Sequence, residues 1–392
     1  REPVVDGAAV FERVRRERDR FVGFVMDSYD KIPAEDLYRD NGAFQPDGSL
    51  LVGDKHLTAD SYVFAVGARP RRLPHLDALG DRVQMSWDVF EWTELPKRVA
   101  FFGPGVIGLE LGLALARLGV EVFLFGVGGF VGPISDPDVR QAALDAFREH
   151  VFLDPDAVVH RIERSEHGVR IEFDDQGEHR TEDVDVVIQT VGQIPNTDRL
   201  NLHHVGLSGR LDIDESTGQI GDTRFFVAGD ANPNRALLHE ASDEGRIAGR
   251  NAARFPQVEP QPRRSKLAIA FTAPDIALVG QRYAELDPEQ IVVGQVSYDD
   301  QGRARTFLRN RGHLSVYADK QTGRFLGAEM VAPDGEHLAH LLAWAHQQQL
   351  TIEQLLDLPF YHPVVQEGVR TALRDANTKL LAAKTPELIL EA

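Results

Sequence analysis

The stretch Val99–Glu110 (VAFFGPGVIGLE) constrains the fold of this chain more than any other. An apolar strand leads directly into six residues, GPGVIG, that fit the pattern G-x-G-x-x-G, and a helical periodicity follows. In such a turn Gly103 permits the tight bend, Gly105 lets the backbone approach a pyrophosphate, and Gly108 allows close packing of helix on strand. The start of the helix offers free N–H groups and a positive dipole end to the anion. We predict a dinucleotide site here, with a simple turn between strand and helix as the alternative.

The end of the next strand departs from this pattern. The dinucleotide fingerprint expects an acidic residue there, which binds the adenosine 2′-hydroxyl. The strand reads VEVFLFG, so Gly126 occupies that position, and no arginine stands beside it to bind a 2′-phosphate. The sequence therefore leaves the choice between NAD and NADP open.

Composition limits the remaining possibilities. A length of 392 residues predicts two or three domains, and no apolar run approaches the roughly 20 residues that span a bilayer. Without such a run we expect no membrane partner. The net charge of −18 repels phosphate backbones, so we expect no nucleic-acid partner either. The chain has no cysteine, which removes disulfides, iron–sulfur clusters and cysteine nucleophiles from these residues. This composition fits a cytoplasmic protein.

Periodicity predicts an α/β chain in which the strand pattern becomes antiparallel after a linker at 256–264. We expect a helix from Asp6 onward, and a strand–helix–strand unit typical of a parallel sheet with strands at Arg98–Phe102 and Val120–Phe125. Later strands are expected at Val169–Phe173, Val184–Thr190 and Phe225–Ala228. Helices are expected at Ile107–Leu118 and Arg235–Phe255, before a linker at 256–264. Beyond it we expect antiparallel strands at Ile291–Tyr298, Ala304–Leu308, His313–Tyr317 and Leu326–Met330, and helices at Glu336–Gln348 and Val364–Ala376.

Two further groups of residues could carry chemistry. Gly229 and Asp230 follow a strand, where the carboxylate could accept hydrogen bonds from cofactor hydroxyls or simply cap the next helix. His362 and Glu367 are close enough in sequence for the carboxylate to orient the imidazole as a general acid/base. The alternative for that pair is a packed histidine beside an exposed glutamate.

The remaining histidines do not predict a metal site. The pairs His337/His340 and His203/His204 lack the acidic partner of an H-E-x-x-H pattern. We therefore predict no metal.

Taken together, these motifs resemble the FAD-dependent pyridine nucleotide-disulfide oxidoreductases, and most closely their dihydrolipoamide dehydrogenases. The resemblance covers essentially the whole chain. Its motifs, in order, are AVGARP (65–70), GPGVIGLE (103–110), TVGQIPN (190–196), AGDAN (228–232), LLHEASDEG (237–245), FTAPDIALVG (271–280) and FYHPVVQEGVRTAL (360–373).

The resemblance implies an α/β fold with two Rossmann-like nucleotide-binding domains and a C-terminal α+β dimerisation domain. The FAD domain would be split and N-terminally incomplete. The expected limits are 1–90 for its first part, 91–200 for the NAD(P) domain, 201–260 for the second FAD part and 261–392 for the dimerisation domain.

The resemblance also implies FAD and NAD as cofactors, with NADP not excluded. Gly229 and Asp230 would contact the ribityl–phosphate region of FAD, and Glu110 would lie beside the nicotinamide and flavin N5. The cofactor-binding residues implied in this way are Gly67, Gly103, Gly105, Val106, Ile107, Gly108, Glu110, Gly192, Gly229, Asp230, Leu238 and His239.

For catalysis, the resemblance implies a homodimer in which His362, supported by Glu367, enters the partner's active site. There the histidine would exchange a proton with a dithiol substrate such as a dihydrolipoyl group, carried by a 2-oxoacid dehydrogenase complex.

One departure from the family bears on activity. The family's first FAD-binding glycine turn and its redox-active cysteine pair precede the point where this chain begins. We therefore expect a fragment of a parent enzyme that oxidises a dithiol and passes the electrons through FAD to NAD(P)⁺. Two alternatives stay open: an FAD-dependent pyridine nucleotide transhydrogenase, and a non-catalytic dimeric remnant that binds nucleotide.

Overall fold

The computed structural model describes residues 5–384, which divide into two compact units. One unit contains residues 5–8, 72–191 and 264–384, and is called unit 1 below. The other, unit 2, contains Ala9–Arg71 and Gly192–Arg263. Each unit is described by itself.

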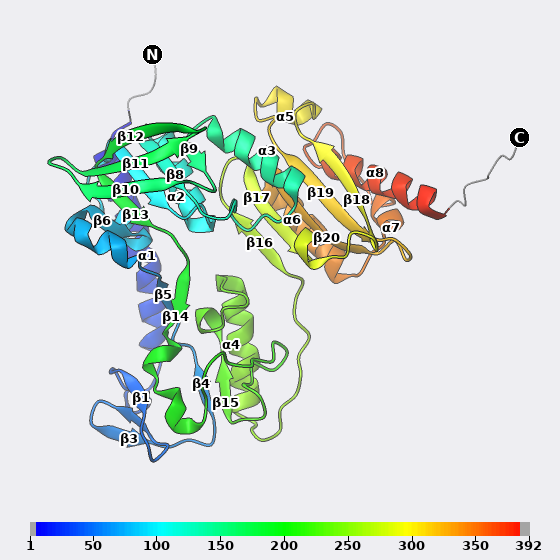
Figure 1. The fold of residues 1–392 in the computed structure, drawn as a ribbon. Coiled ribbons are helices and arrows are strands. Elements are labelled where there is room, and N and C mark those ends of the chain that lie inside the picture. Colours follow the sequence, from blue (N-terminus) through cyan, green and yellow to red (C-terminus); the bar gives the residue numbers. More distant parts are fainter. Residues whose placement is uncertain (1–4, 385–392) are drawn as a thin grey trace, which may run out of the picture. The chain divides into compact units, whose positions relative to one another are not determined.

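A parallel sheet of five strands, in the order β6-β13-β7-β8-β9, forms the first layer of unit 1 (Figure 1). Its strands are Val83–Met85 (β6), Val186–Gln189 (β13), Arg98–Phe102 (β7), Glu121–Phe125 (β8) and Phe152–Asp154 (β9). All four pairings are parallel. Four of the five residues in β7 and in β8 are buried, as expected for a sheet that is covered on both faces.

Helices and a small antiparallel sheet accompany this layer. Helix α2 (Val106–Arg117) links β7 to β8, and α3 (Pro137–Arg148) follows β8. The small sheet contains β10 (Val159–Arg164), β11 (Val169–Asp175) and β12 (Glu178–Val184). Its inner residues pack into the same apolar cluster as Phe123 and Phe125 of the parallel sheet.

The C-terminal part of unit 1 is a second, antiparallel sheet in the order β16-β17-β20-β19-β18. Its strands are Leu267–Ala270 (β16), Asp275–Gly280 (β17), Ile291–Ser297 (β18), His313–Asp319 (β19) and Phe325–Ala332 (β20). Helix α6 (Gly335–Gln347) packs on β17, and α8 (Glu367–Lys384) packs on β18. The short helices of this part are α5 (Gly302–Thr306) and α7 (Ile352–Leu356).

The strand expected at Ala304–Leu308 is wrong, because this segment contains helix α5. The side chain of Gln301 accepts a hydrogen bond from the Ala304 N–H at 2.7 Å and caps the helix. Ala304 itself is fully buried. A side-chain cap and one buried residue thus stabilise a helix in a segment whose apolar residues had indicated a strand.

Unit 2 contains three small sheets and two long helices. Strands β1 (Gly42–Phe44), β2 (Leu50–Val52) and β3 (Lys55–Leu57) form a meander. Strand β4 (Tyr62–Phe64) pairs in parallel with β15 (Phe225–Val227), and β5 (Ala68–Pro70) pairs with β14 (Gln193–Pro195). The long helices are α1 (Gly7–Tyr29), which begins in the last residues of the 5–8 segment, and α4 (Leu238–Ala252).

Short 3-10 helices complete the description: Ala34–Asp36, Pro74–Arg82, Ser86–Glu91, Asn196–Arg199, Leu202–Val205, Gly229–Ala231 and Tyr283–Glu285.

The expected α/β class and the other expected strands and helices are confirmed. Their ends shift by at most three residues, except that α8 continues to Lys384. The four-part domain division stays a prediction. The compact units change at 8/9, 71/72, 191/192 and 263/264. Within the described residues, no helix combines the length and apolar character that crossing a membrane requires. The expected cytoplasmic location stays a prediction.

Candidate functional site

The glycine turn between β7 and α2 has the geometry that its sequence predicts. Gly103 has a φ of +106°, which favours glycine, and its N–H donates to the Phe125 carbonyl at 2.8 Å. A Cβ on Gly103 would lie 2.5 Å from the Thr190 carbonyl oxygen, and one on Gly108 would lie 2.2 Å from the Gly103 carbonyl oxygen. Both positions therefore exclude a side chain, and the backbone of α2 lies directly against the end of β7.

Gly105 differs from its two neighbours in the motif. The nearest atom that a Cβ there would meet is the Thr190 carbonyl oxygen, at 4.0 Å. Gly105 is the N-cap of α2, and no side chain of the described residues caps its first turn. An unobstructed backbone beside uncapped N–H groups, here called the pyrophosphate cradle, can bind a pyrophosphate through hydrogen bonds. These residues therefore fit a dinucleotide.

The packing around Gly126 explains why the expected acidic residue is missing. Its N–H donates to the Asp154 carbonyl at 2.7 Å, and its carbonyl accepts from the Ala157 N–H at 3.0 Å. A Cβ would lie 2.6 Å from the Pro155 carbonyl oxygen and 2.8 Å from Cγ of Pro104. The end of β8 therefore has no space for a side chain.

Glu110, one turn into α2, lies at the boundary between the nucleotide-binding part and the C-terminal part of unit 1. Its Oε1 accepts a hydrogen bond from the Phe271 N–H at 2.8 Å. This hydrogen bond holds the carboxylate of Glu110 against the backbone of Phe271. Its expected place beside a nicotinamide stays a prediction.

In unit 2, Gly229 and Asp230 form a short 3-10 turn directly after β15. Gly229 has a φ of +68°, and its N–H donates to Oε2 of Glu244 at 3.0 Å. The other oxygen of Glu244 accepts from the Asn232 side chain at 3.1 Å. One buried carboxylate thus fixes both ends of the loop that carries Asp230.

Glu244 belongs to a buried charge cluster that sequence reasoning missed. Arg263 donates to Oε1 of Glu244 at 3.3 Å and also pairs with Glu240. Burial raises the pKa of Glu244, and the charge of Arg263 opposes that rise. The signal was present in the sequence, because the buried side of α4 contains Glu240, Glu244, Ile247, Ala248 and Asn251 at helical spacing.

The other predicted FAD residues lie near this loop or on the adjoining ladder. Leu238 and His239 begin α4, and both are exposed. Gly67 precedes β5 and accepts from the Asn196 N–H at 3.0 Å, and Gly192 accepts from the Arg71 N–H at 2.9 Å. The two glycines therefore lie at the two ends of the β5–β14 pairing.

His362 and Glu367 form the predicted pair at the start of α8. Nδ1 of His362 lies 2.9 Å from Oε1 of Glu367, whose other oxygen accepts from the Val364 N–H at 3.2 Å. The hydrogen bond from His362 is the largest of the effects that lower the pKa of Glu367. The imidazole is 81% exposed, so its far edge is available to a group from outside the described residues.

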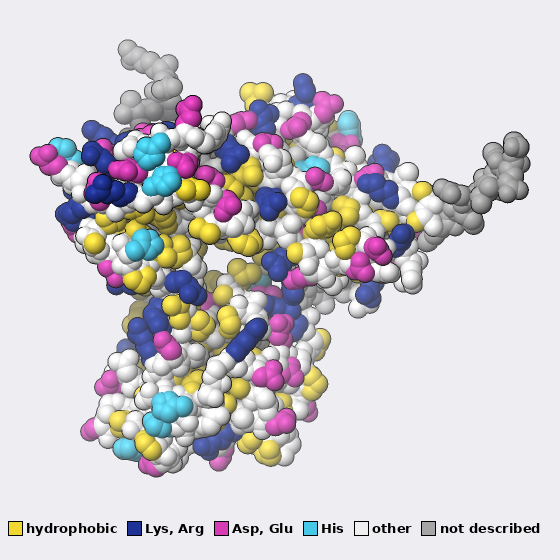
Figure 2. Space-filling model, in the orientation of Figure 1, with side chains coloured by type: hydrophobic (Ala, Val, Ile, Leu, Met, Phe, Trp, Pro, Cys, Tyr) yellow, Lys and Arg dark blue, Asp and Glu magenta, His cyan; other side chains and the backbone are white. Residues whose placement is uncertain are grey.

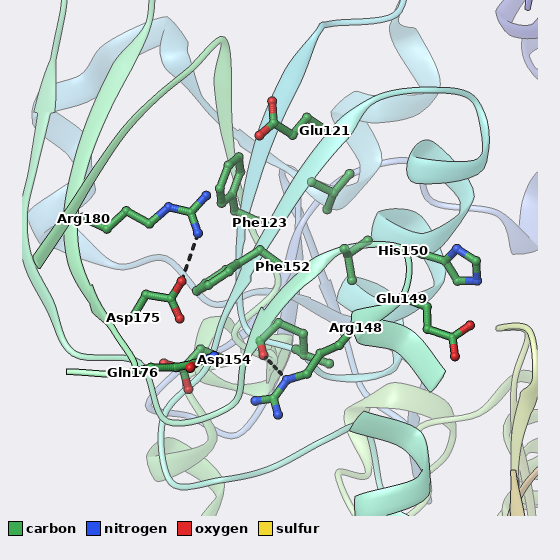
Figure 3. A pocket seen from close by; sticks show the side chains of 13 residues that line it. Glu121, Phe123, Arg148, Glu149, His150, Phe152, Asp154, Asp175, Gln176 and Arg180 are labelled. Atoms are coloured by element: carbon green, nitrogen blue, oxygen red, sulfur yellow. Dashed lines mark hydrogen bonds and ion pairs between the residues drawn. The ribbon is translucent and has the colours of Figure 1, made fainter. Parts of the chain in front are cut away.

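A cavity of about 840 Å³ opens along the edge strand β9 (Figure 3). Arg180 extends over the rings of Phe123 and Phe152 and pairs with Asp175 at 3.0 Å (Figure 3). The residues that line the cavity come from β8, β9, the end of α3 and the β11–β12 hairpin, and do not include the glycine turn. This cavity is therefore distinct from the pyrophosphate cradle.

The structure thus places the predicted residues in three groups. The glycine turn with Glu110 and the His362–Glu367 pair are both in unit 1, and no hydrogen bond or ion pair of the described residues links them. The Gly229–Asp230 loop is in unit 2 with Gly67, Gly192, Leu238 and His239.

Comparison with known proteins identifies the family of the chain. Residues 17–245 match the pyridine nucleotide-disulphide oxidoreductase family, and residues 267–373 match the dimerisation domain of the same family. The dihydrolipoyl dehydrogenase of Geobacillus stearothermophilus is 28% identical over 79% of this chain and 67% of its own length.

Two solved structures share the fold. The crystal structure of LpdA from Mycobacterium tuberculosis has a TM-score of 0.69 and 28% identity, covering 85% of this chain and 72% of LpdA. The copper complex of the flavoprotein disulfide reductase RclA from Escherichia coli has a TM-score of 0.78 at 21% identity, covering 93% of this chain and 85% of RclA. With the family match spanning more than half of its residues, the chain belongs to the pyridine nucleotide-disulphide oxidoreductases, FAD- and NAD-dependent oxidoreductases that act on sulfur groups.

Proposed function

We propose that these residues are part of a flavoprotein oxidoreductase of the dihydrolipoyl dehydrogenase type. In this enzyme, oxidation of a dithiol is coupled through FAD to reduction of NAD⁺. The observation that carries this proposal is the His362–Glu367 pair, with its 2.9 Å hydrogen bond and exposed imidazole. Oxidation of a dithiol to a disulfide releases two electrons and two protons, and NAD⁺ accepts two electrons and one proton. The second proton needs an acceptor, and an imidazole oriented by a carboxylate is suited to that task.

The residues of this chain have separate tasks in the proposed reaction. Gly105 and the first N–H groups of α2 bind the pyrophosphate of NAD. The loop of Gly229 and Asp230, fixed by Glu244, offers its carboxylate to the hydroxyls of FAD. FAD, when bound, supplies the electron transfer between the sulfur group and the nicotinamide. His362 accepts the thiol proton, and Glu367 orients the imidazole and stabilises its charged form.

We also propose that the enzyme is a homodimer. His362 lies at the surface, next to an apolar cavity of about 550 Å³ whose lining includes the exposed Trp344 and Tyr361. An exposed acid/base pair beside exposed aromatic side chains needs a second surface to exclude water. The match of residues 267–373 to the family's dimerisation domain supports this arrangement.

A second candidate is hydride transfer between two nicotinamide nucleotides through FAD, which the glycine turn and the Gly229–Asp230 loop would serve equally well. That reaction needs no disulfide, whereas thiol–disulfide exchange needs a thiolate from elsewhere.

One set of assays on the full-length protein that contains these residues separates the candidates. The visible spectrum reports bound flavin, reduction of NAD⁺ by dihydrolipoamide reports the proposed reaction, and reduction of thio-NAD⁺ by NADH reports transhydrogenation. The proposal expects dihydrolipoamide-dependent reduction that His362→Gln decreases by about 100-fold or more and that the control His340→Gln leaves unchanged. Flavin-containing protein that transfers hydride between nucleotides but does not oxidise dihydrolipoamide would contradict it.

A further inference from the structure

The outer face of the β10–β12 sheet carries a cluster of side chains that the proposed reaction does not use. Its members are His160 on β10, Asp174 on β11 and His179 on β12. Figure 2 shows histidine side chains among acidic and basic ones on the surface over these strands. The cluster thus joins all three strands of the sheet at its solvent face.

A β-bulge brings His160 to this face. Val159 pairs with Phe173, and the next pair is Arg161 with Glu172, so His160 is the extra residue between them. A bulge of this kind redirects a side chain that the alternation of the strand would otherwise send inward. Asp174 and His179 need no such device, because they lie directly opposite one another in the β11–β12 register.

The three side chains converge on one point. Nε2 of His160 lies 2.8 Å from Oδ1 of Asp174, and Nδ1 of His179 lies 3.8 Å from the same oxygen. One ligand atom from each residue lies within 4.8 Å of the others. Ligand atoms around a tetrahedral zinc ion are about 3.3 Å apart, a separation that lies between the two distances measured here.

We propose that His160, Asp174 and His179 bind a divalent first-row transition ion such as Zn²⁺, with water completing its coordination. Two imidazoles and one carboxylate suit these ions, whereas Mg²⁺ prefers ligands that are all oxygen. Exposed fractions of 43% and 57% for the two histidine side chains leave both imidazoles free to adjust toward an ion. The ion would cross-link β10, β11 and β12.

The charges around the cluster favour a cation. Glu172 adds a fourth candidate ligand, with Oε2 at 3.9 Å from Nε2 of His179. All four arginines on the same strands are paired with acids: Arg161 with Glu163 at 2.7 Å, Arg164 with Asp81 at 2.6 Å, Arg170 with Asp183 at 3.0 Å and Arg180 with Asp175 at 3.0 Å. Their positive charge is thereby largely compensated near the proposed ion.

Calorimetric titration of the purified chain with ZnCl₂ tests the site. We expect one Zn²⁺ that MgCl₂ in excess does not displace, and affinity that falls about tenfold or more in His160→Ala, His179→Ala and Asp174→Asn. The matched control is the double variant His337→Ala/His340→Ala, which also removes two exposed histidines and leaves the affinity unchanged. Equal affinity in wild type and in the double variant His160→Ala/His179→Ala overturns the proposal.

A second measurement does not depend on any variant. Diethyl pyrocarbonate modifies exposed histidines, and mass spectrometry of the resulting peptides locates the modification. Zn²⁺ is expected to protect His160 and His179 in the wild-type protein while His337 and His340 stay reactive. Unchanged modification of His160 and His179 in the presence of Zn²⁺ also overturns the site, leaving a metal-free hydrogen bond between His160 and Asp174.

Discussion

At the scale of single residues, the most informative position is Gly126, where the fingerprint of the fold expects an acid. The backbone there is bonded on both sides, and the space that a Cβ would occupy is filled by Pro155 and Pro104. The glycine is thus a packing requirement of this loop. A family pattern alone could not reveal this, because Pro155 reaches the site from the end of a different strand.

We predict that Gly126→Asp destabilises the fold by about 1–3 kcal/mol, because the new side chain must displace the Pro155 carbonyl. Thermal unfolding followed by circular dichroism measures this effect. The control is Val127→Asp, because the side chain of Val127 is 82% exposed and its replacement is expected to change stability by less than about 0.5 kcal/mol. A Gly126→Asp protein as stable as the control would show that the loop can move aside.

The glycines at 105 and 108 are expected to respond differently to the same change. Gly108→Ala forces a Cβ against the Gly103 carbonyl oxygen and should destabilise the fold by about 1–3 kcal/mol. Gly105→Ala meets nothing closer than 4.0 Å, so the fold should survive while a methyl group enters the pyrophosphate cradle. We expect NADH affinity to fall by about tenfold in Gly105→Ala, as measured by fluorescence titration with thermal unfolding as the control for folding. Unchanged NADH affinity would argue against pyrophosphate binding at this turn.

At the scale of elements, helix α4 shows how buried charge can position a loop. Its carboxylates Glu240 and Glu244 share Arg263, and Glu244 in turn bonds the Gly229 N–H. Burial raises the pKa of Glu244, so its contribution to stability is full below its unfolded pKa and is lost as the pH rises through the folded pKa. The charge of Arg263 lowers the pKa of Glu244 and so reduces the stability that is lost as the pH rises.

Arg263→Met is therefore expected to destabilise unit 2 by about 3–5 kcal/mol at pH 7, because it leaves the buried Glu244 without its cation and Glu240 with Arg235 alone. The loss should be smaller at pH 5 than at pH 7, because a raised pKa favours the uncharged form of Glu244 as the pH falls. Urea unfolding at both pH values, followed by far-ultraviolet circular dichroism, measures the difference. Arg254→Met, which removes an exposed arginine paired with Glu259, is the control. A loss that is equal at both pH values would contradict the assigned cause.

The elements that could be predicted from sequence are those whose signal is local. The glycine turn, the buried strands β7 and β8 and the His362–Glu367 pair each depend on residues close together in the chain. Helix α5 was missed because its cap, Gln301, is not among the residue types that usually begin a helix. The pairing of the α4 acids with Arg263 and the bulge at His160 depend on partners that are distant in sequence, although the helical spacing of Glu240 and Glu244 is itself a local signal.

At the scale of the whole molecule, the described residues of unit 1 contain a junction between the nucleotide-binding part and the antiparallel sheet. Glu329 of β20 is fully buried, and it accepts from the N–H groups of Ser135, Asp136 and Tyr283 at 2.6, 3.0 and 2.7 Å. Asp136 caps α3 with one oxygen and accepts from the Tyr317 hydroxyl at 2.9 Å with the other. Residues almost 200 positions apart in sequence thus share one buried polar cluster, which no local pattern could predict.

We predict that Glu329→Gln destabilises unit 1 by about 2–4 kcal/mol, because an amide offers one acceptor oxygen where a carboxylate offers two. Tryptophan fluorescence during urea unfolding is a suitable readout, because Trp87, Trp92 and Trp344 all lie in this unit. Glu353→Gln, at an exposed position of α7, is the control. A Glu329→Gln protein with wild-type stability would show that water or a neighbouring group replaces the lost bonds.

The Glu329 junction also bears on protein engineering by domain exchange. A chimera that joins the nucleotide-binding part of this chain to the dimerisation domain of a relative would bring its own residue to position 329. If that residue is not a carboxylate, the N–H groups of Ser135 and Asp136 would be buried without an acceptor. Grafts that exchange the loop at 135–136 together with β20 should therefore fold, while grafts that divide them should yield little soluble protein.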